Sequence, residues 1–143
     1  IGRLGDVPKP VRDQVDWAAQ LTADNSKLKL NMAISYGGRL EIIEAIRELL
    51  AKAARGESVL ATEETVAQHL YTTGDPDPDL IIRTGGERRL SNFLLWQSAY
   101  AELYFSDTMW PEFTADDFLQ ALAEYQKRER RFGKIRKKAS ERE

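Results

Sequence analysis

The stretch "DLIIRTGGERRLSNFLLWQ", residues 79–97, decides the fold. Its apolar triplet, residues 80–82, predicts a short buried strand, and Arg83 follows it directly. Gly85 and Gly86 then predict a tight turn, because glycine adopts backbone conformations that other residues avoid. Arginines are seldom buried without a partner, so three of them around a glycine turn at the end of a core strand indicate a bound anion.

Strands and helices alternate on both sides of this stretch. Residues 28–36, "LKLNMAISY", alternate apolar and polar and run into Gly-Gly, which predicts another strand. Residues 39–54 predict an amphipathic helix, with these apolar residues on one face: Ile42, Ile43, Ile46, Leu49 and Ala53. Further predicted helices cover residues 11–21, 62–70, 92–101 and 114–130, and further predicted strands cover 79–84 and 102–106. This order predicts an α/β fold with a largely parallel central sheet flanked by helices, where ligands bind beyond the carboxyl ends of the strands.

The composition limits the classes of protein. A chain of 143 residues with 42% hydrophobic content suits one globular domain, and the formal charge of -2 excludes a generally basic nucleic-acid binder. The absence of cysteine excludes disulfides and thiolate zinc sites and fits a reducing compartment such as the cytoplasm. The chain has no P-loop or dinucleotide signature, and the single histidine, His69, is predicted to be a structural or surface residue rather than a catalyst.

The polar residues around the glycine turn suggest which anion binds. Arg83 and Arg89 offer planar forks of donors that match phosphate or carboxylate, and the Ser91 hydroxyl adds another donor. Glycine lets backbone N–H groups point at the same oxygens. Glu87 and Glu102 beside a phosphate imply a divalent ion or an arginine-orienting role. We therefore expect a diphosphate–magnesium site, with mutual pairing of these charges on a solvated loop as the alternative.

Aromatic residues cluster after this turn: Trp96, Tyr100, Tyr104, Phe105 and Trp110. Core packing is the default explanation for such a cluster. Because few polar residues interrupt it, an interface between subunits is the alternative use.

Three motifs carry a resemblance to a known family. "DLIIRTGGERRLSNFLLWQSAYAELYFSDTMWPEF" (79–113) closely resembles the signature region of the cis-prenyltransferases, the undecaprenyl (or decaprenyl) diphosphate synthase family. "SYGGRLEIIEAIREL" (35–49) is similar to that family's preceding motif, and "RERRFGK" (128–134) to its C-terminal Arg-x-Gly element. The resemblance extends over about residues 28–134, with the motifs in the family's order.

The resemblance implies an enzyme that condenses isopentenyl diphosphate with an allylic diphosphate, farnesyl or geranyl diphosphate, to make a cis-polyprenyl diphosphate. It also implies Mg²⁺ as cofactor and a homodimer. The following residues match the positions that bind isopentenyl diphosphate: Arg83, Arg89, Leu90, Ser91, Arg131 and Gly133. In this family the Arg-x-Gly element reaches across the dimer interface. Glu102 matches the acid associated with Mg²⁺, and Glu87 matches an acid with a supporting catalytic role.

The family's principal catalytic aspartate and asparagine have no counterpart in this sequence. The resemblance assigns residues 1–133 to the C-terminal portion of one cis-prenyltransferase domain and residues 134–143 to a charged tail. We expect another chain or fragment to supply the N-terminal half, and we expect this chain to be inactive without it. A non-catalytic partner subunit of a cis-prenyltransferase is the alternative, and the retained diphosphate-binding residues argue against it.

A basic run lies near the C-terminus, with eight basic residues and one acid between Lys127 and Lys138. Three uses fit such a run: nucleic-acid binding, contact with an anionic membrane surface, and solvated charge at a helix end. We expect no nucleic-acid partner and a cytoplasmic protein, with peripheral membrane contact retained beside solvated charge.

Overall fold

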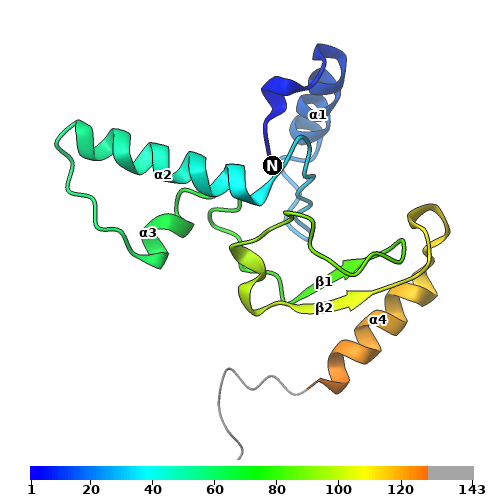
Figure 1. Ribbon diagram of the computed structural model, residues 1–143. Coiled ribbons are helices and arrows are strands. Elements are labelled where there is room, and N and C mark those ends of the chain that lie inside the picture. Colours follow the sequence, from blue (N-terminus) through cyan, green and yellow to red (C-terminus); the bar gives the residue numbers. More distant parts are fainter. Residues whose placement is uncertain (129–143) are drawn as a thin grey trace, which may run out of the picture. The chain divides into compact units, whose positions relative to one another are not determined.

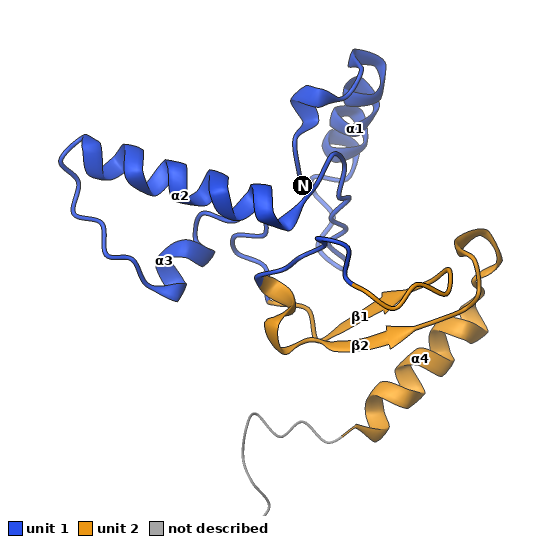
Figure 2. Cartoon of the chain, in the orientation of Figure 1, with its two compact units in different colours: residues 1–76, 90–96 blue, residues 77–89, 97–143 orange. Residues whose placement is uncertain are grey.

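The computed structural model describes residues 1–128. The chain divides into two compact units that interleave along the sequence (Figures 1 and 2). Unit 1 holds Ile1–Pro76 and Leu90–Trp96, and unit 2 holds Asp77–Arg89 together with the chain from Gln97 onward. The predicted tail, residues 134–143, lies outside the described residues.

Unit 1 is built mainly from helices. They are a short 3₁₀ turn η1 (Leu4–Asp6), α1 (Lys9–Leu21), α2 (Gly38–Ala54) and α3 (Glu63–Ala67). Pro8 and Pro10 flank the start of α1, where a missing N–H costs nothing. The predicted helices over 11–21 and 39–54 are therefore confirmed, and the helix predicted over 62–70 is shorter than expected.

The strand predicted over residues 28–36 is not formed. Backbone bonds do join residues 1–3 to residues 32–35, for example Ile34 N–H to the Ile1 carbonyl at 3.0 Å. A regular strand needs a continuous ladder, and no further strand among residues 1–128 supplies one here. The alternating apolar side chains consequently remain exposed, with Leu28 83% and Leu30 77% accessible.

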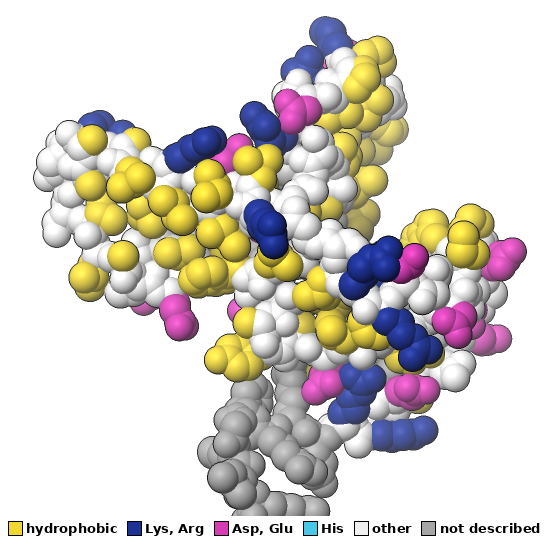
Figure 3. Space-filling model, viewed as in Figure 1, with side chains coloured by type: hydrophobic (Ala, Val, Ile, Leu, Met, Phe, Trp, Pro, Cys, Tyr) yellow, Lys and Arg dark blue, Asp and Glu magenta, His cyan; other side chains and the backbone are white. Residues whose placement is uncertain are grey.

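Helix α2 buries a different face from the predicted one. The residues it buries are Gly38, Glu41, Ala45 and Leu49, so of the predicted face Leu49 alone is buried. This face carries the bond from the Tyr71 N–H to Glu41 and the contact with α3. The isoleucines Ile43 and Ile46 are 45% and 40% exposed, and hydrophobic side chains lie at the surface over α2 in Figure 3.

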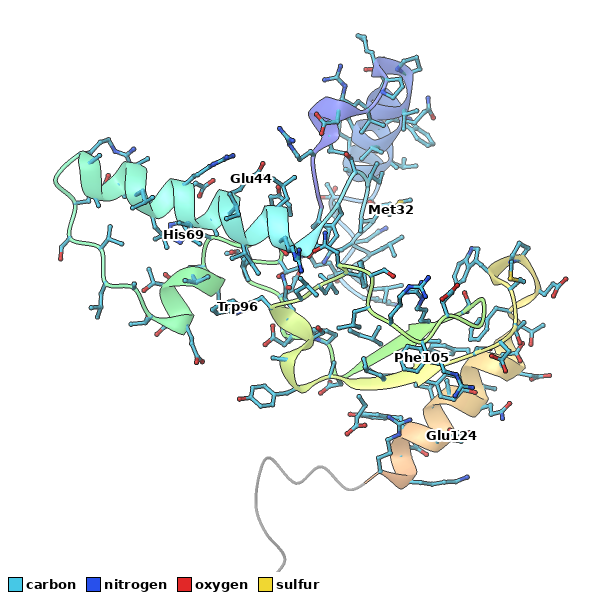
Figure 4. All side chains as sticks on the ribbon, viewed as in Figure 1. Met32, Glu44, His69, Trp96, Phe105 and Glu124 are labelled. Atoms are coloured by element: carbon cyan, nitrogen blue, oxygen red, sulfur yellow. The ribbon has the colours of Figure 1, made fainter. Side chains whose placement is uncertain are left out.

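The predicted structural role of His69 is confirmed within unit 1. Its Nδ1 bonds the Thr65 carbonyl at 2.8 Å, and its Nε2 lies 2.7 Å from Lys52 Nζ (Figure 4). These two contacts together select the tautomer in which Nδ1 donates and Nε2 accepts. The ring thereby links the segment after α3 to the last turn of α2.

Unit 2 contains the parallel sheet. Strands β1 (Leu80–Arg83) and β2 (Glu102–Phe105) pair in parallel, with Leu80 opposite Glu102 and Arg83 opposite Phe105. Helix α4 (Ala115–Lys127) packs on β2, and the short helices η2 (Gln97–Tyr100) and η3 (Trp110–Glu112) flank β2 in sequence. The strands predicted over 79–84 and 102–106, their parallel pairing and the flanking helix are confirmed.

Helix α4 begins where the sequence predicts. The Thr114 side chain accepts from the Asp117 N–H, and the Asp117 carboxylate accepts from the Thr114 N–H, which is a complete capping box. The Thr114 N–H and then the Thr114 hydroxyl donate to the Asp117 carboxylate and lower its pKa, because accepting these bonds favours the ionised form. Ala121 is the buried residue of this helix, whereas the apolar residues Phe118 and Leu119 are 46% and 59% exposed.

The connection from β1 to β2 corrects another prediction. A helix is predicted over 92–101, but the structure has turns through 91–96 and the short η2. Ser91, Asn92 and Leu94 adopt left-handed backbone, with φ of 48°, 65° and 43°, and a right-handed helix cannot pass through them. The aromatic residues nearby are not all core residues, since Tyr100 is 77% and Trp110 75% exposed.

Of the helices in residues 1–128, none combines the length and the apolar character that crossing a membrane requires.

Candidate active site

Three of the predicted site residues lie together on the loop that follows β1. Arg83, the last residue of the strand, donates from Nη1 to the Arg89 carbonyl. The Arg89 guanidinium pairs with the Glu87 carboxylate on the same loop. The side chains of Arg89 and Glu87 are 63% and 49% exposed, so a ligand can reach them and compete for their bonds. We call residues 83–89 the arginine loop.

The glycines of the arginine loop have a different role from the predicted one. Gly85 and Gly86 have φ of 87° and 77°, a left-handed backbone that favours glycine. The Gly85 N–H donates to the Thr108 carbonyl at 2.8 Å, and the Gly86 N–H donates to the Ser106 carbonyl at 2.9 Å. Both amides therefore hold the arginine loop to the segment after β2. The prediction that these N–H groups point at the anion is wrong for this structure, and side chains must supply the donors.

Glu102 lies at the other end of the strand pair from Arg83. In the parallel register Glu102 is opposite Leu80, three residues before Arg83, which places them roughly 10 Å apart along the strands. The Glu102 carboxylate accepts from Arg128 Nη1 at 2.8 Å, and the same nitrogen lies 2.9 Å from the Leu103 carbonyl. The structure thus does not gather Glu102 with the arginine loop, contrary to the prediction of one shared site.

The other predicted site residues fall elsewhere. Leu90 and Ser91 follow Arg89 directly in the chain but belong to unit 1. Arg131 and Gly133 lie outside the described residues. A neighbour of Ser91 that the sequence reasoning missed, Asn92, accepts on its side-chain oxygen from the Arg39 N–H at 2.9 Å. The turn that contains Ser91 and Asn92 has no glycine, and asparagine is a residue that tolerates left-handed backbone. An asparagine in such a turn is the signal from which the role of Asn92 could have been predicted.

A buried carboxylate next to the "SYGGR" turn was also missed. Glu41 is 1% exposed, accepts from the Tyr36 hydroxyl, and accepts from the Tyr71 N–H at 2.8 Å. Burial, and then the bond to Glu41, raise the pKa of the Tyr36 phenol far above its ordinary value. Burial, followed by a bond to Glu44, raises the pKa of Tyr71 to about 12. The two phenols are therefore neutral donors at any physiological pH, which keeps the turn at the start of α2 rigidly bonded.

The described residues do not form a complete metal site. Within residues 1–128 no group of three or more His, Cys, Asp or Glu side chains could hold a metal ion. Glu102, the residue predicted for Mg²⁺, is bound to Arg128. Mg²⁺ is commonly bound by one or two carboxylates with phosphate oxygens and waters, so Glu102 alone does not make a site.

Unit 2 also contains an apolar pocket of about 480 Å³. Its lining consists of Ile82, Thr84, Trp110, Phe113, Thr114, Ala115 and Phe118. Trp110 stacks on Phe113 with ring centroids 6.4 Å apart, and both rings line this pocket. The pocket is therefore formed by the end of β1, the segment that leads into α4 and the beginning of α4 itself.

A family model described as "Putative undecaprenyl diphosphate synthase" matches residues 1–133. The chain belongs to the undecaprenyl diphosphate synthase family. This match confirms the resemblance of its motifs to the cis-prenyltransferases. The parallel strand pair described above lies within the matched residues.

Known members of this family are similar over almost the whole chain. "Isoprenyl transferase 1" of Corynebacterium diphtheriae is 51% identical over 140 residues, which cover 94% of this chain and 53% of that protein. "Isoprenyl transferase" of Thermus thermophilus is 53% identical over 138 residues, covering 92% of this chain and 52% of that protein. The chain thus spans about half the length of these curated relatives.

Solved structures of the family confirm the fold. Lavandulyl diphosphate synthase from Lavandula x intermedia, solved with dimethylallyl diphosphate, matches with a TM-score of 0.90 at 41% identity, covering 94% of this chain and 58% of that one. A probable undecaprenyl diphosphate synthase from Campylobacter jejuni matches with a TM-score of 0.81 at 40% identity, covering 94% and 61%.

Proposed function

We propose that the whole protein is a cis-prenyltransferase that condenses isopentenyl diphosphate with farnesyl or geranyl diphosphate. The observation that carries the proposal is the arginine loop, in which Arg83, Glu87 and Arg89 are joined at the carboxyl end of a parallel strand. Membership of the undecaprenyl diphosphate synthase family supports the reaction class. Because this chain spans about half the length of its relatives, we propose that it supplies the isopentenyl diphosphate subsite and is inactive without further sequence.

The reaction needs charge neutralisation and alignment more than covalent chemistry from the protein. A bond forms between C4 of isopentenyl diphosphate and C1 of the allylic substrate. The allylic C1–O bond breaks, inorganic diphosphate leaves, and the new unit loses one proton from C2. Arg83 and Arg89, with Ser91 and Leu90, would hold the diphosphate of isopentenyl diphosphate so that its C4 faces the allylic carbon.

The internal bonds of the arginine loop suggest how it stays ready for substrate. Glu87 holds Arg89, and the Arg89 carbonyl holds Arg83, so both guanidinium groups have acceptors before any anion arrives. A diphosphate carries more negative charge than one carboxylate and offers more acceptor oxygens. It would therefore replace the Arg89 carbonyl as the acceptor of Arg83 and offer Arg89 further acceptors, while Glu87 continues to orient Arg89; this is the supporting role we propose for Glu87.

Several parts of the proposal rest on the family resemblance alone. Mg²⁺ would neutralise diphosphate charge, and Glu102 is the residue that the resemblance assigns to it. Arg131 and Gly133 would complete the subsite across a homodimer interface. A separately supplied N-terminal half, a cytoplasmic location and peripheral membrane contact through the basic run also remain proposals.

Replacing Arg83 tests the proposed subsite. In the protein at its full length, Arg83→Ala is expected to raise KM for isopentenyl diphosphate about 10- to 100-fold, the loss of one or two bonds to a charged group. KM for farnesyl diphosphate should change little, because that substrate uses the other subsite. The measurement is incorporation of labelled isopentenyl diphosphate into lipid at varied concentrations of each substrate.

Arg88→Ala is the matched control, since Arg88 is an exposed arginine on the same loop and is not among the residues assigned to the diphosphate. It removes the same charge from the residue next to Arg89, and it does not remove either partner of the Arg83–Arg89 bond. An equal rise in KM for isopentenyl diphosphate in both variants would mean that the loss of positive charge, and not the position of Arg83, causes the effect. An unchanged KM in Arg83→Ala would refute the subsite.

A further inference from the structure

The turn that carries Ser91 has a backbone that few residues adopt. Ser91 and Asn92 have φ of 48° and 65°, and both lie in unit 1. Left-handed backbone costs most residues of order 1 kcal/mol, and asparagine tolerates it best after glycine. Something must therefore hold the turn in this conformation, and the contacts of Asn92 show what does so.

Asn92 bonds the start of α2 with both its backbone and its side chain. Its carbonyl accepts from the Gly38 N–H at 2.7 Å, and its side-chain oxygen accepts from the Arg39 N–H at 2.9 Å. These two N–H groups belong to the first turn of α2, where a helix leaves donors without internal partners. Asn92 therefore acts as a cap for a helix that begins 54 residues earlier in the chain.

The two glycines at the start of α2, Gly37 at the N-cap and Gly38 as the first helical residue, make room for this cap. A Cβ on Gly37 would lie 2.7 Å from Asn92 Nδ2, closer than real Cβ contacts. A Cβ on Gly38 would lie 3.0 Å from the Leu95 nitrogen and 3.2 Å from the Asn92 carbonyl oxygen. The "SYGGR" and "RLSN" motifs are thus two halves of one docked structure, which we call the Asn92 clamp: Gly37, Gly38, Arg39 and Asn92.

We propose that Asn92 is a positioning residue for isopentenyl diphosphate, because the Asn92 clamp fixes the backbone of the adjacent Ser91. The inference rests on the proposed function, in which Ser91 donates to the diphosphate. Asn92 does not touch the substrate in this scheme. It holds Ser91 in its left-handed conformation and so sets where the hydroxyl points.

The test compares two glycine substitutions in the same turn of the protein at its full length. Asn92→Gly keeps a residue that accepts left-handed backbone but removes the side-chain bond to Arg39. Leu94→Gly, at φ 43°, introduces the same backbone freedom and leaves the Asn92 clamp intact. The readouts are KM for isopentenyl diphosphate, KM for farnesyl diphosphate, kcat and the unfolding midpoint.

We expect Asn92→Gly to raise KM for isopentenyl diphosphate about fivefold, or about 1 kcal/mol by the relation between affinity and free energy. KM for farnesyl diphosphate should stay within about twofold, and Leu94→Gly should leave both KM values within about twofold of the parent. Asn92→Asp keeps the side-chain oxygen that accepts from Arg39. It should therefore lower the unfolding midpoint less than Asn92→Gly does. A merely structural role would lower the midpoint and the yield of active protein without separating the two KM values.

Two results would overturn the inference: an isopentenyl diphosphate KM within about twofold of the parent in Asn92→Gly, or an equal rise in Leu94→Gly. Ser91→Ala separates this failure from failure of the proposed function. If Ser91→Ala and Arg83→Ala raise this KM and Asn92→Gly does not, the subsite stands and the positioning role falls. If none of the three raises it, the proposed subsite itself is wrong.

Discussion

Glu41 is a charged side chain in the interior of unit 1, and its partners explain why the fold tolerates it. One carboxylate oxygen accepts from the Tyr36 hydroxyl and the other from the Tyr71 N–H. Tyr36 also packs edge-on against Tyr71 and Phe93, with centroids 6.2 and 5.7 Å apart. A buried charge with good partners is neutral or modestly favourable for stability, but removing it leaves its donors without acceptors.

Glu41→Ala is therefore expected to lower the free energy of unfolding by about 1–3 kcal/mol, the cost of leaving two half-buried donors without their acceptor. Glu48→Ala, an exposed glutamate on the same helix, should change it by less than about 0.5 kcal/mol. Urea denaturation followed by circular dichroism measures both. Equal values for the two variants would mean that the Tyr36 and Tyr71 bonds contribute little.

At the scale of elements, α4 is specified by its own sequence. The Thr114 and Asp117 side chains close a capping box at its start, and acidic residues occupy its first turn, where the helix dipole favours them. All of these interactions span three residues, so neither the rest of unit 2 nor unit 1 is needed to form them. The helix should accordingly respond to changes in its cap as an isolated helix does.

Thr114→Ala is expected to destabilise the chain by about 1 kcal/mol, with Thr114→Ser close to the parent, because serine keeps the accepting oxygen. Thermal unfolding by calorimetry gives both values. Asp116→Ala removes a first-turn charge outside the capping box and serves as the comparison. If Asp116→Ala lowers the stability as much as Thr114→Ala does, the effect comes from the helix dipole rather than from the capping box.

The accuracy of the sequence predictions follows this distinction between local and distant interactions. Strands β1 and β2 and helix α4 were predicted because their apolar runs and caps are continuous in sequence. The arginine loop was predicted because Arg83, Glu87 and Arg89 lie within seven residues of one another. By contrast, the strand over 28–36 depends on neighbours that residues 1–128 do not supply, so its alternating pattern was not sufficient.

The helix predicted over 92–101 fails for another reason. Its apolar composition favours a helix, but the Asn92 clamp and the left-handed residues at 91–94 hold the segment in turns. The clamp joins residues 54 positions apart, and no local pattern in the sequence reveals such a contact. The same limit applies to Glu41 and Tyr71, whose bond fixes the buried face of α2.

At the scale of the whole molecule, the chain passes between its two units more than once. It leaves unit 1 after Pro76, returns to it for residues 90–96, and leaves again at Gln97. The crossover between the parallel strands therefore contains a segment that is docked in the other unit (Figure 2). What holds that segment in unit 1 is its packing on the first turn of α2.

Gly38→Ala should loosen this docking selectively, because a Cβ there meets the backbone of Leu95 and Asn92. Hydrogen exchange is expected to accelerate for the amides of residues 90–96 and of the first turn of α2. Exchange in β1 and β2 should stay near the parent rate, since their ladder does not involve Gly38. A uniform acceleration across both units would mean that they unfold as one cooperative body.

The engagement of the Gly85 and Gly86 amides has an evolutionary consequence. An anion site made of backbone amides survives most substitutions, because every residue brings the same N–H. Here the amides are committed to the segment after β2, so in the proposed subsite recognition of diphosphate would fall to guanidinium and hydroxyl groups, which single substitutions can remove. The bonds from the Gly85 and Gly86 amides to the segment after β2 do not depend on those side chains. A descendant of such a chain could thus lose its substrate while keeping its fold, and persist as an inactive companion of an active copy.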